Sequence, residues 1–352
     1  MKAWVLHDIN NMTYEEYETP KADDGWALVD VKATGICGSD IPRAFVTGAH
    51  VKPLIIGHEF SGQVSPEDNS VWAGKRVGIF PLIPCGKCAP CQNKQYEMCR
   101  NYNYLGSRCD GAFADKVCVP LENLIELPDN VTYEQAAMLE PMAVAVHAMR
   151  RGFNLTKGKK AEDMTVAVCG LGTIGMFLVM FLKQAGFNNI IAIGNKDFQK
   201  DCIEKLGISK DNYCDCKTKA SISFINEKTD GLGVDLYFEC VGKNETISDA
   251  VESTMPAGSI VLVGNPYSDM SFDKNVYWKI LRNQIKLTGT WNSSFTHEED
   301  DDWHYVLDCL KKEEIHPEAF ITHKYPMDKI MEGFEIMRDK KEDYIKIMGL
   351  NE

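Results

Sequence analysis

The chain has 352 residues, of which 44% are hydrophobic, and a formal net charge of −13 at pH 7. This length is sufficient for two domains, each with its own core, and the acidic charge disfavours nucleic acid and anionic membrane surfaces as partners. Thirteen cysteines, an odd number spread along the chain, favour a reducing cytoplasmic location over disulfide bridges.

The first 146 residues are rich in short β-like runs. The opening segment MKAWVLHDINN contains neither the basic nor the apolar part of a signal peptide. Runs such as 26–32 and 76–80 are bounded by Gly, Pro and Asp, a pattern typical of strands separated by tight turns. We therefore predict a β-rich first domain over residues 1–146.

Three separate segments of this region contain candidate ligands for a catalytic metal. They supply the Cys37 thiol, the His58 imidazole with the adjoining Glu59 carboxylate, and the Glu140 carboxylate. A zinc ion held by Cys37, His58 and Glu140 would keep the open fourth position that a catalytic zinc requires. Glu59 could bind directly or replace Glu140 when ligands exchange, and the sequence leaves open which carboxylate is bound at rest.

A second set of cysteines has closer spacing. Cys85, Cys88, Cys91 and Cys99 are separated by two, two and seven residues, with Gly and Pro among the intervening positions. Short Cys-x-x-Cys steps allow four thiolates to converge on one tetrahedral zinc. We predict a structural zinc here, with a disulfide framework as the alternative.

Residues 147–290 have a different pattern. Continuous apolar runs alternate with longer helical stretches, which predicts a parallel sheet covered on both faces, and so an α/β domain. The apolar runs are 165–169, 190–193, 234–238 and 259–263. The longest apolar run near the middle, 176–182, is too short to span a bilayer.

A glycine-rich turn joins the first of these runs to an apolar helix at 176–184. The turn reads Gly170-Leu-Gly172-Thr173-Ile174-Gly175, the dinucleotide fingerprint in the strand-turn-helix context that it requires. Gly170 would make the tight turn, Gly172 would admit the pyrophosphate, and Gly175 would allow close packing. The phosphates would lie at the N-terminus of the helix.

The second strand of this domain ends without the acidic residue that normally binds the ribose 2′-hydroxyl of NAD. The chain reads Gly194-Asn195-Lys196 at that point, and glycine there leaves room for a 2′-phosphate. Asn195 could donate a hydrogen bond, and Lys196 and Lys200 supply positive charge. We predict NADP as coenzyme. In the alternative, both lysines are solvated helix-start residues and the coenzyme is NAD.

After residue 290 the chain becomes acidic and helical over 298–312, and a β-like run follows at 344–348. The acidic cluster 298–302 is interpreted as a solvated helix start.

These motifs, in this order, resemble the zinc-dependent medium-chain alcohol and polyol dehydrogenases. Glu140, where alcohol dehydrogenases proper have a cysteine, resembles the sorbitol dehydrogenase branch. Three further segments look closest to the galactitol-1-phosphate 5-dehydrogenases: 37–43 with 48–50, 105–111 and 279–282. The resemblance implies a GroES-like catalytic domain (1–146, to which 291–352 returns), a doubly wound Rossmann domain (147–290), an active site between them, and a homodimer or homotetramer.

The same resemblance implies hydride transfer between NAD(P) and a secondary hydroxyl of a polyol phosphate, which gives a ketose phosphate. A free polyol is the alternative substrate. Ser39 would relay the substrate proton (a turn-capping serine is the alternative), and Asp40 would orient His58 or form an Asx-turn. The candidate phosphate-binding residues are Arg43, His50, Lys52 and Arg108, and the alternative for each is a solvated surface charge. Two other functional classes stay open. One is a binding protein that keeps the structural zinc but has lost catalytic activity, and the other is a zinc-free reductase.

Overall fold

The computed structural model describes residues 1–156, 158–266 and 268–351 and divides the chain into two compact units. The first unit combines Met1–Ala143 with Ser293–Glu352, and the second is Val144–Asn292. Within the described residues, no helix combines the length and apolar character needed to cross a membrane.

A seven-stranded sheet is the main element of the first unit, and β3 lies in its interior. β3 pairs antiparallel with β5, β9 and β18, and its alternate residues Ala27, Val29 and Val31 are buried, as expected for a strand with one face on a core. The strands are β3 (Trp26–Gly35), β5 (Glu59–Val64), β6 (Arg76–Ile79), β9 (Lys116–Pro120), β10 (Leu124–Glu126), β17 (Ile321–Pro326) and β18 (Lys346–Leu350).

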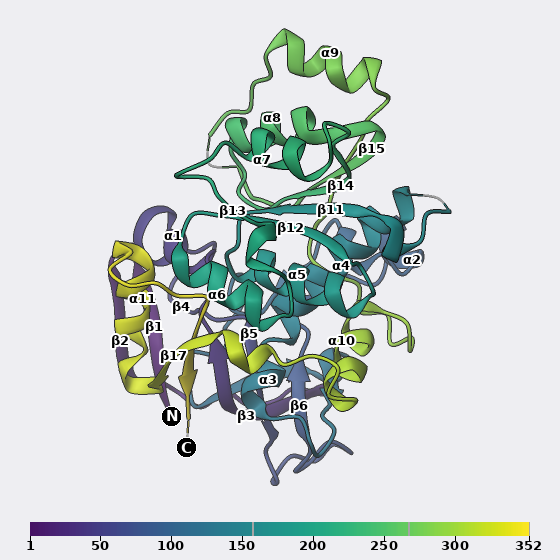
Figure 1. The fold of residues 1–352 in the computed structure, drawn as a ribbon. Helices are drawn as coiled ribbons and strands as arrows, with labels where there is room; N and C mark the ends of the chain where they lie inside the picture. The colour runs from purple at the N-terminus through teal and green to yellow at the C-terminus, as the bar shows by residue number, and fades with distance from the viewer. Residues whose placement is uncertain (157, 267, 352) are drawn as a thin grey trace. The chain divides into compact units, whose positions relative to one another are not determined.

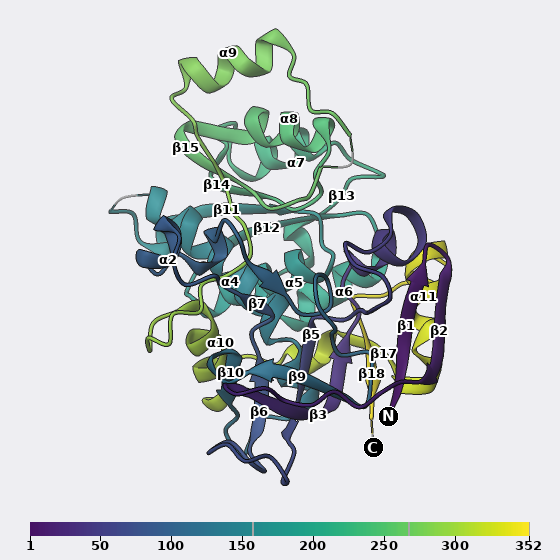
Figure 2. The same cartoon turned by 180° about the vertical axis from the view of Figure 1, so that it is seen from behind.

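Two smaller sheets complete the strands of this unit. They comprise β1 (Lys2–Asp8), β2 (Asn11–Glu16) and β4 (Leu54–Ile55) in one sheet, and β7 (Leu82–Ile83) and β8 (Asn103–Tyr104) in the other. β1 and β2 lie beside α11 (Ile330–Asp339), as Figures 1 and 2 show, and Trp4, Leu6 and Phe334 belong to one apolar cluster there. The C-terminal segment is therefore packed into the N-terminal fold.

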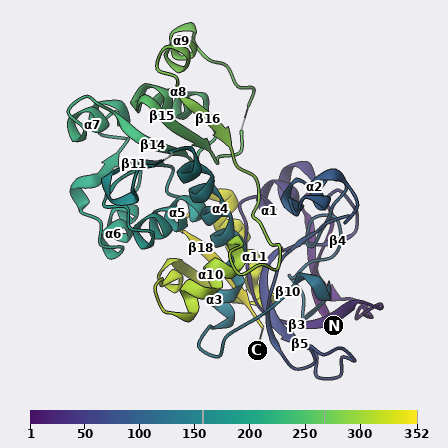
Figure 3. The same cartoon turned by 90° about the vertical axis from the view of Figure 1, so that its right-hand side faces the viewer.

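The remaining helices of the first unit are short. α3 contacts β3, β5 and β6 (Figure 3), and a capping box between Thr132 and Gln135 fixes its start. The helices are α1 (Asp40–Pro42), α2 (Ala89–Gln92), α3 (Tyr133–Ala137) and α10 (Asp302–Lys311).

The acidic cluster before α10 differs from its sequence interpretation. Asp301 is buried and accepts a hydrogen bond from the His304 backbone N–H at 2.8 Å, so it caps the helix. Asp302 is also buried and accepts one from the Ser294 backbone N–H at 2.8 Å. The prediction of a solvated helix start was wrong for these two residues, because both carboxylates satisfy backbone donors.

The second unit is a six-stranded, wholly parallel sheet with strand order β13-β12-β11-β14-β15-β16, which confirms the predicted doubly wound fold. α7 and α8 cover one face of the sheet, and α5 and α6 cover the other (Figure 1). Its strands are β11 (Thr165–Cys169), β12 (Asn189–Gly194), β13 (Tyr213–Asp215), β14 (Val234–Glu239), β15 (Thr254–Leu262) and β16 (Lys286–Gly289).

The helices of this unit follow the strands along the chain. The first turn of α4, which contains Glu140, belongs to the first unit, and the rest of the helix belongs to the second. The helices are α4 (Leu139–Leu155), α5 (Thr173–Gln184), α6 (Asp197–Lys205), α7 (Ser221–Lys228), α8 (Asn244–Ser253) and α9 (Lys274–Arg282).

Candidate functional site

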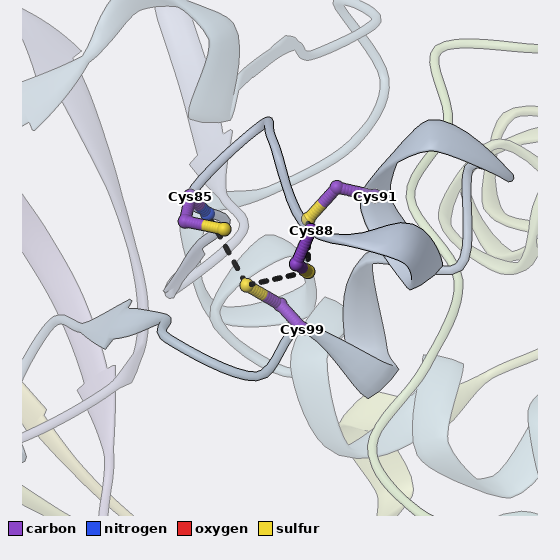
Figure 4. A group of neighbouring side chains, drawn as sticks. All are labelled: Cys85, Cys88, Cys91 and Cys99. Atoms are coloured by element: carbon purple, nitrogen blue, oxygen red, sulfur yellow. Dashed lines mark hydrogen bonds between the residues drawn. The ribbon is translucent and has the colours of Figure 1, made fainter.

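The four closely spaced cysteines converge in space. Their sulfur atoms all lie within 4.8 Å of one another, and Figure 4 shows the side chains directed toward a common centre. Cys88 Sγ lies 3.4 Å from Cys91 Sγ and 3.9 Å from Cys99 Sγ. Zinc–sulfur bonds of ~2.3 Å in a tetrahedron place sulfur atoms ~3.8 Å apart. The geometry of the four side chains therefore fits a zinc ion.

The electrostatics of this cluster favour a bound cation. Backbone N–H groups of Arg100 and Cys91 lower the pKa of Cys88 to about 6. Burial, together with the neighbouring thiols, raises the pKa of Cys91 to about 12. Four thiols this close cannot all ionise without a cation, and zinc supplies the charge that permits it.

A second cluster of possible metal ligands brings together Cys37, His58 and Glu59. Their ligand atoms lie within 4.8 Å of one another, and His58 and Glu59 are buried. Cys37 follows the end of β3, and Glu59 begins the neighbouring strand β5, with which β3 pairs. Strand pairing thus assembles residues that are 21 positions or more apart in the sequence.

Glu140 lies next to this cluster, in the first turn of α4, and is buried. Burial, together with the nearby Glu59 carboxylate, raises the pKa of Glu140 to about 7. The Tyr104 hydroxyl donates to Glu140 Oε1 at 3.1 Å, and the Tyr104 ring packs edge-on against His58. Two buried carboxylates beside a thiol and an imidazole form a donor set that suits zinc.

Lys346 is a buried cation that sequence reasoning missed. It is 1% exposed, and its Nζ pairs with Glu59 Oε2 and donates to the Ile36 carbonyl at 3.2 Å. Gly35 gives this pair its space, because a Cβ there would lie 2.4 Å from Glu59 Oε2. A lysine inside the apolar run 344–348 was the available signal, since a charged residue is seldom fully buried unless it is paired.

Asp40 is fully buried at the start of α1 and holds several groups of the site. Its Oδ2 accepts the Cys37 backbone N–H at 3.0 Å, and its Oδ1 accepts from Arg43 Nη1 at 2.7 Å. His58 Nδ1 lies 3.5 Å from Asp40 Oδ1 and makes no hydrogen bond within the described chain. Asp40 therefore faces His58 at ion-pair distance and orders the loop that contains Cys37.

Ser39 lies beside the cluster. Its Oγ is 3.3 Å from Cys37 Sγ. It occupies the N-cap position of α1 but makes no capping hydrogen bond, so capping does not explain this serine.

Three glycines fix the backbone around His58. A Cβ at Gly106 would lie 2.2 Å from the Gly57 carbonyl oxygen, and one at Gly111 would lie 2.1 Å from the same atom. Gly57 itself has φ +101°, a conformation that side chains disfavour. The segment 105–111 therefore packs directly on the residue before His58, with no space for a side chain between them.

The glycine-rich turn after β11 has a different constraint at each glycine. Gly170 has φ +95°, and a Cβ there would lie 2.6 Å from Val241 Cγ2. Gly172 is the N-cap of α5 and has open space on its Cβ side. A Cβ at Gly175 would lie 1.9 Å from the Gly170 carbonyl oxygen. Thr173 and Ile174 begin α5, so the turn leads directly into a helix N-terminus.

The end of β12 differs in one respect from its sequence interpretation. A Cβ at Gly194 would lie 2.5 Å from Gln199 Oε1 and 2.8 Å from the Tyr213 hydroxyl. Gln199 Oε1 also accepts the Asn195 backbone N–H at 3.0 Å, and the Tyr213 hydroxyl accepts that of Lys196 at 3.1 Å. The space that glycine was expected to leave for a 2′-phosphate is filled, on the Cβ side, by these two side chains.

The four candidate phosphate-binding residues have different surroundings. Arg43 pairs with Asp40 and donates to Ser107 Oγ at 3.3 Å, and Lys52 pairs with Asp8. His50 is exposed. Arg108 is exposed, stacks on Tyr102 at 4.6 Å and has no ion-pair partner in the described part of the chain.

Comparison with protein families identifies two matching segments. Residues 23–129 match the family described as alcohol dehydrogenase GroES-like domain, and residues 173–312 match the zinc-binding dehydrogenase family.

Individual relatives match over most of the chain. Galactitol 1-phosphate 5-dehydrogenase of Escherichia coli (strain K12) is 30% identical over 304 residues, with 84% of each chain covered. D-arabitol-phosphate dehydrogenase of Enterococcus avium is 31% identical over 344 residues, with 93% of each covered. An alcohol dehydrogenase of Escherichia coli CFT073, solved with NADH, is 25% identical with a TM-score of 0.87 and covers 100% of this chain and 99% of its own.

Proposed function

Because the chain belongs to the zinc-dependent medium-chain polyol dehydrogenase family, we propose that it oxidises a secondary hydroxyl of a polyol phosphate to a ketose phosphate. The buried cluster of Cys37, His58 and Glu59, with Glu140 beside it, carries this proposal. The chain is an NAD(P)-dependent oxidoreductase with a zinc-binding site, so the alternatives of a binding protein and a zinc-free reductase do not apply.

Different residues of the cluster have different proposed roles: metal binding, positioning of the metal ligands, and proton transfer. Cys37, His58 and a carboxylate would hold a zinc ion, which would supply Lewis acidity toward a substrate hydroxyl, and a bound nicotinamide coenzyme would supply the hydride acceptor. Asp40 holds the Cys37 backbone and faces His58 Nδ1, which keeps both side chains in place. The Ser39 Oγ, 3.3 Å from Cys37 Sγ, would accept the proton of the substrate hydroxyl while its own hydroxyl proton goes to solvent water.

A screen of coenzyme-linked activity tests the substrate assignment. Phosphorylated and free hexitols and pentitols are assayed side by side with NADP and NAD. The proposal expects the highest kcat/KM with a phosphorylated polyol and loss of activity after zinc removal. Comparable rates on sorbitol and its phosphate would contradict a phosphate site, and activity in metal-stripped protein would contradict the Lewis-acid role.

Arg108 is our candidate for binding the substrate phosphate. Two of the four candidates are arginines. Arg43 pairs with Asp40, whereas Arg108 has no ion-pair partner in the described chain. The ring of Tyr102, on which it stacks, lies 6.2 Å from that of Tyr104, whose hydroxyl contacts Glu140. A guanidinium here can form a charge-assisted pair with a phosphate near the metal cluster.

Replacing Arg108 by Gln should lower activity on phosphorylated substrates but not on free ones. We expect kcat/KM for the polyol phosphate to fall roughly tenfold to hundredfold, the effect of losing a charge-assisted hydrogen bond of ~1.5–3 kcal/mol. Activity on the free polyol should stay the same. Lys52→Gln is the matched control, since Lys52 already pairs with Asp8. An equal loss on both substrates would argue against a phosphate contact.

NADP is our proposed coenzyme, with side chains rather than backbone N–H groups as the donors to its 2′-phosphate. The N–H groups of Asn195 and Lys196 are already bonded to Gln199 and Tyr213. Lys196 is the N-cap residue of α6, and Lys200 lies within the first turn and a half. A 2′-phosphate bound here would be favoured by the helix N-terminus and by these two cations, although Asp197 in the first turn opposes it.

Replacing Lys196 by Met should lower the preference for NADP. A unit charge pair at ~4 Å and an effective dielectric of ~20 gives about 4 kcal/mol before desolvation and mobility, and a third of that corresponds to roughly tenfold. We expect kcat/KM for NADP to fall by that factor with NAD unchanged. Lys205→Met, in the last turn of the same helix, is the control. A wild-type preference for NAD would refute the assignment.

We further propose a homodimer or homotetramer in the cytoplasm, on the family resemblance. Size-exclusion chromatography with light scattering tests the oligomeric state.

A further inference from the structure

The metal cluster contains two carboxylates, and each has a different hydrogen-bond donor. Lys346 Nζ pairs with Oε2 of Glu59, and the Tyr104 hydroxyl donates to Oε1 of Glu140 at 3.1 Å. Glu59 lies within ligand distance of Cys37 and His58, whereas Glu140 lies outside that group. The two donors therefore hold the carboxylates in unequal positions.

Burial makes both arrangements well defined. Lys346 and Glu59 are 1% and 2% exposed, and Glu140 is 8% exposed. Lys346 donates to the Ile36 carbonyl as well as to Glu59, and a Cβ at Gly35 would lie 3.3 Å from Lys346 Nζ, so a side chain there would crowd the pair. Tyr104 is fixed by its edge-on contact with His58. Neither donor can move far without disturbing these contacts.

The two buried cations of the site each have a carboxylate partner. Arg43 pairs with Asp40, and Lys346 pairs with Glu59. Without Lys346, Glu59 would be a buried carboxylate with no cation beside it. Lys346 is therefore a charge partner of Glu59 as well as a hydrogen-bond donor to it.

We propose that Lys346 and Tyr104 are positioning residues with opposite effects: Lys346 fixes Glu59 as the carboxylate that faces the metal, and Tyr104 holds Glu140 back from it. Glu59 keeps Oε1 for the metal while Oε2 stays with Lys346. Glu140 reaches the metal when it leaves the Tyr104 hydroxyl. The inference rests on the proposed zinc site and adds which carboxylate occupies it and what controls the exchange.

The test measures metal affinity instead of turnover. The dissociation constant of the second zinc equivalent is determined by competition with a chromophoric chelator, with the four-cysteine site left loaded. Lys346→Met should weaken zinc binding by about tenfold or more, the size expected when the group that orients a ligand is lost. Tyr104→Phe should instead tighten it severalfold and change the absorption spectrum of Co²⁺ at this site, because Glu140 is released as an additional ligand.

Double variants distinguish positioning from general damage to the fold. Tyr104→Phe should have no effect on affinity in a Glu140→Gln background, and Lys346→Met should have none in a Glu59→Gln background. The Lys346→Met/Glu59→Gln pair also removes both buried charges together, which protects against misfolding. Weakened or unchanged binding in Tyr104→Phe, or an effect that persists without Glu140, would overturn the inference. Wild-type protein that binds no second metal would instead refute the proposed zinc site itself.

Discussion

Replacing Cys37 by Ser is expected to abolish turnover, with kcat falling by about 10³-fold or more, since a Lewis-acid metal contributes several kcal/mol to the transition state. Zinc content should fall from about two equivalents per chain to about one. Coenzyme affinity should change little, because the glycine-rich turn at Gly170–Gly175 belongs to the other compact unit.

Three measurements check this expectation: steady-state kinetics, zinc analysis and a coenzyme titration by fluorescence. Cys109→Ser is the matched control, because Cys109 is a half-buried free thiol outside both ligand clusters of the described chain. Appreciable activity in Cys37→Ser, or retention of both zinc equivalents, would contradict the role assigned to Cys37.

Replacing Cys91 by Ala should destabilise the protein without altering the catalytic cluster. The four cysteines occupy a segment of short elements, with α2 only four residues long, so a zinc ion bound there would supply much of the segment's folding energy. We expect the loss of one zinc equivalent and a fall in Tm on the order of 5 °C or more.

Thermal unfolding and zinc analysis of Cys91→Ala test this role, with Cys118→Ala as the control at a half-buried cysteine of β9. The oligomeric state should be measured on the same samples. Full zinc content together with an unchanged Tm would mean that the four cysteines do not hold a structural zinc.

The fold was predictable where local pattern and tertiary environment agree. β11 has the predicted limits, Thr165–Cys169, because the strand lies within a covered sheet and its residues from Val166 to Cys169 are apolar and buried. The glycine-rich turn is largely local in the same way, since Gly175 packs directly on the Gly170 carbonyl oxygen and Gly172 begins the helix with open space beside it. The cysteine cluster was predictable because its ligands are close in sequence.

The residues that hold the metal ligands were not predictable in the same way. Lys346 reaches Glu59 across 287 positions of sequence, and Tyr104 reaches Glu140 across 36. No sequence spacing predicts such pairs. The order of strands in the sheet brings Lys346 to Glu59, and the position of the first turn of α4 brings Glu140 to Tyr104. Gln199 filling the space beside Gly194 is a similar case, since its side chain folds back from α6 onto the end of β12.

The close packing of Gly57, Gly106 and Gly111 limits how this protein can diverge. The same backbone segment, 104–111, contains Tyr104, Ser107 and Arg108 and rests on the residue that precedes His58. A mutation that reshapes this segment to accept a new substrate is therefore expected to displace His58, a proposed metal ligand, as well. Drift in specificity should start at residues outside the glycine contact, such as Arg108, and laboratory evolution libraries should keep these three glycines fixed.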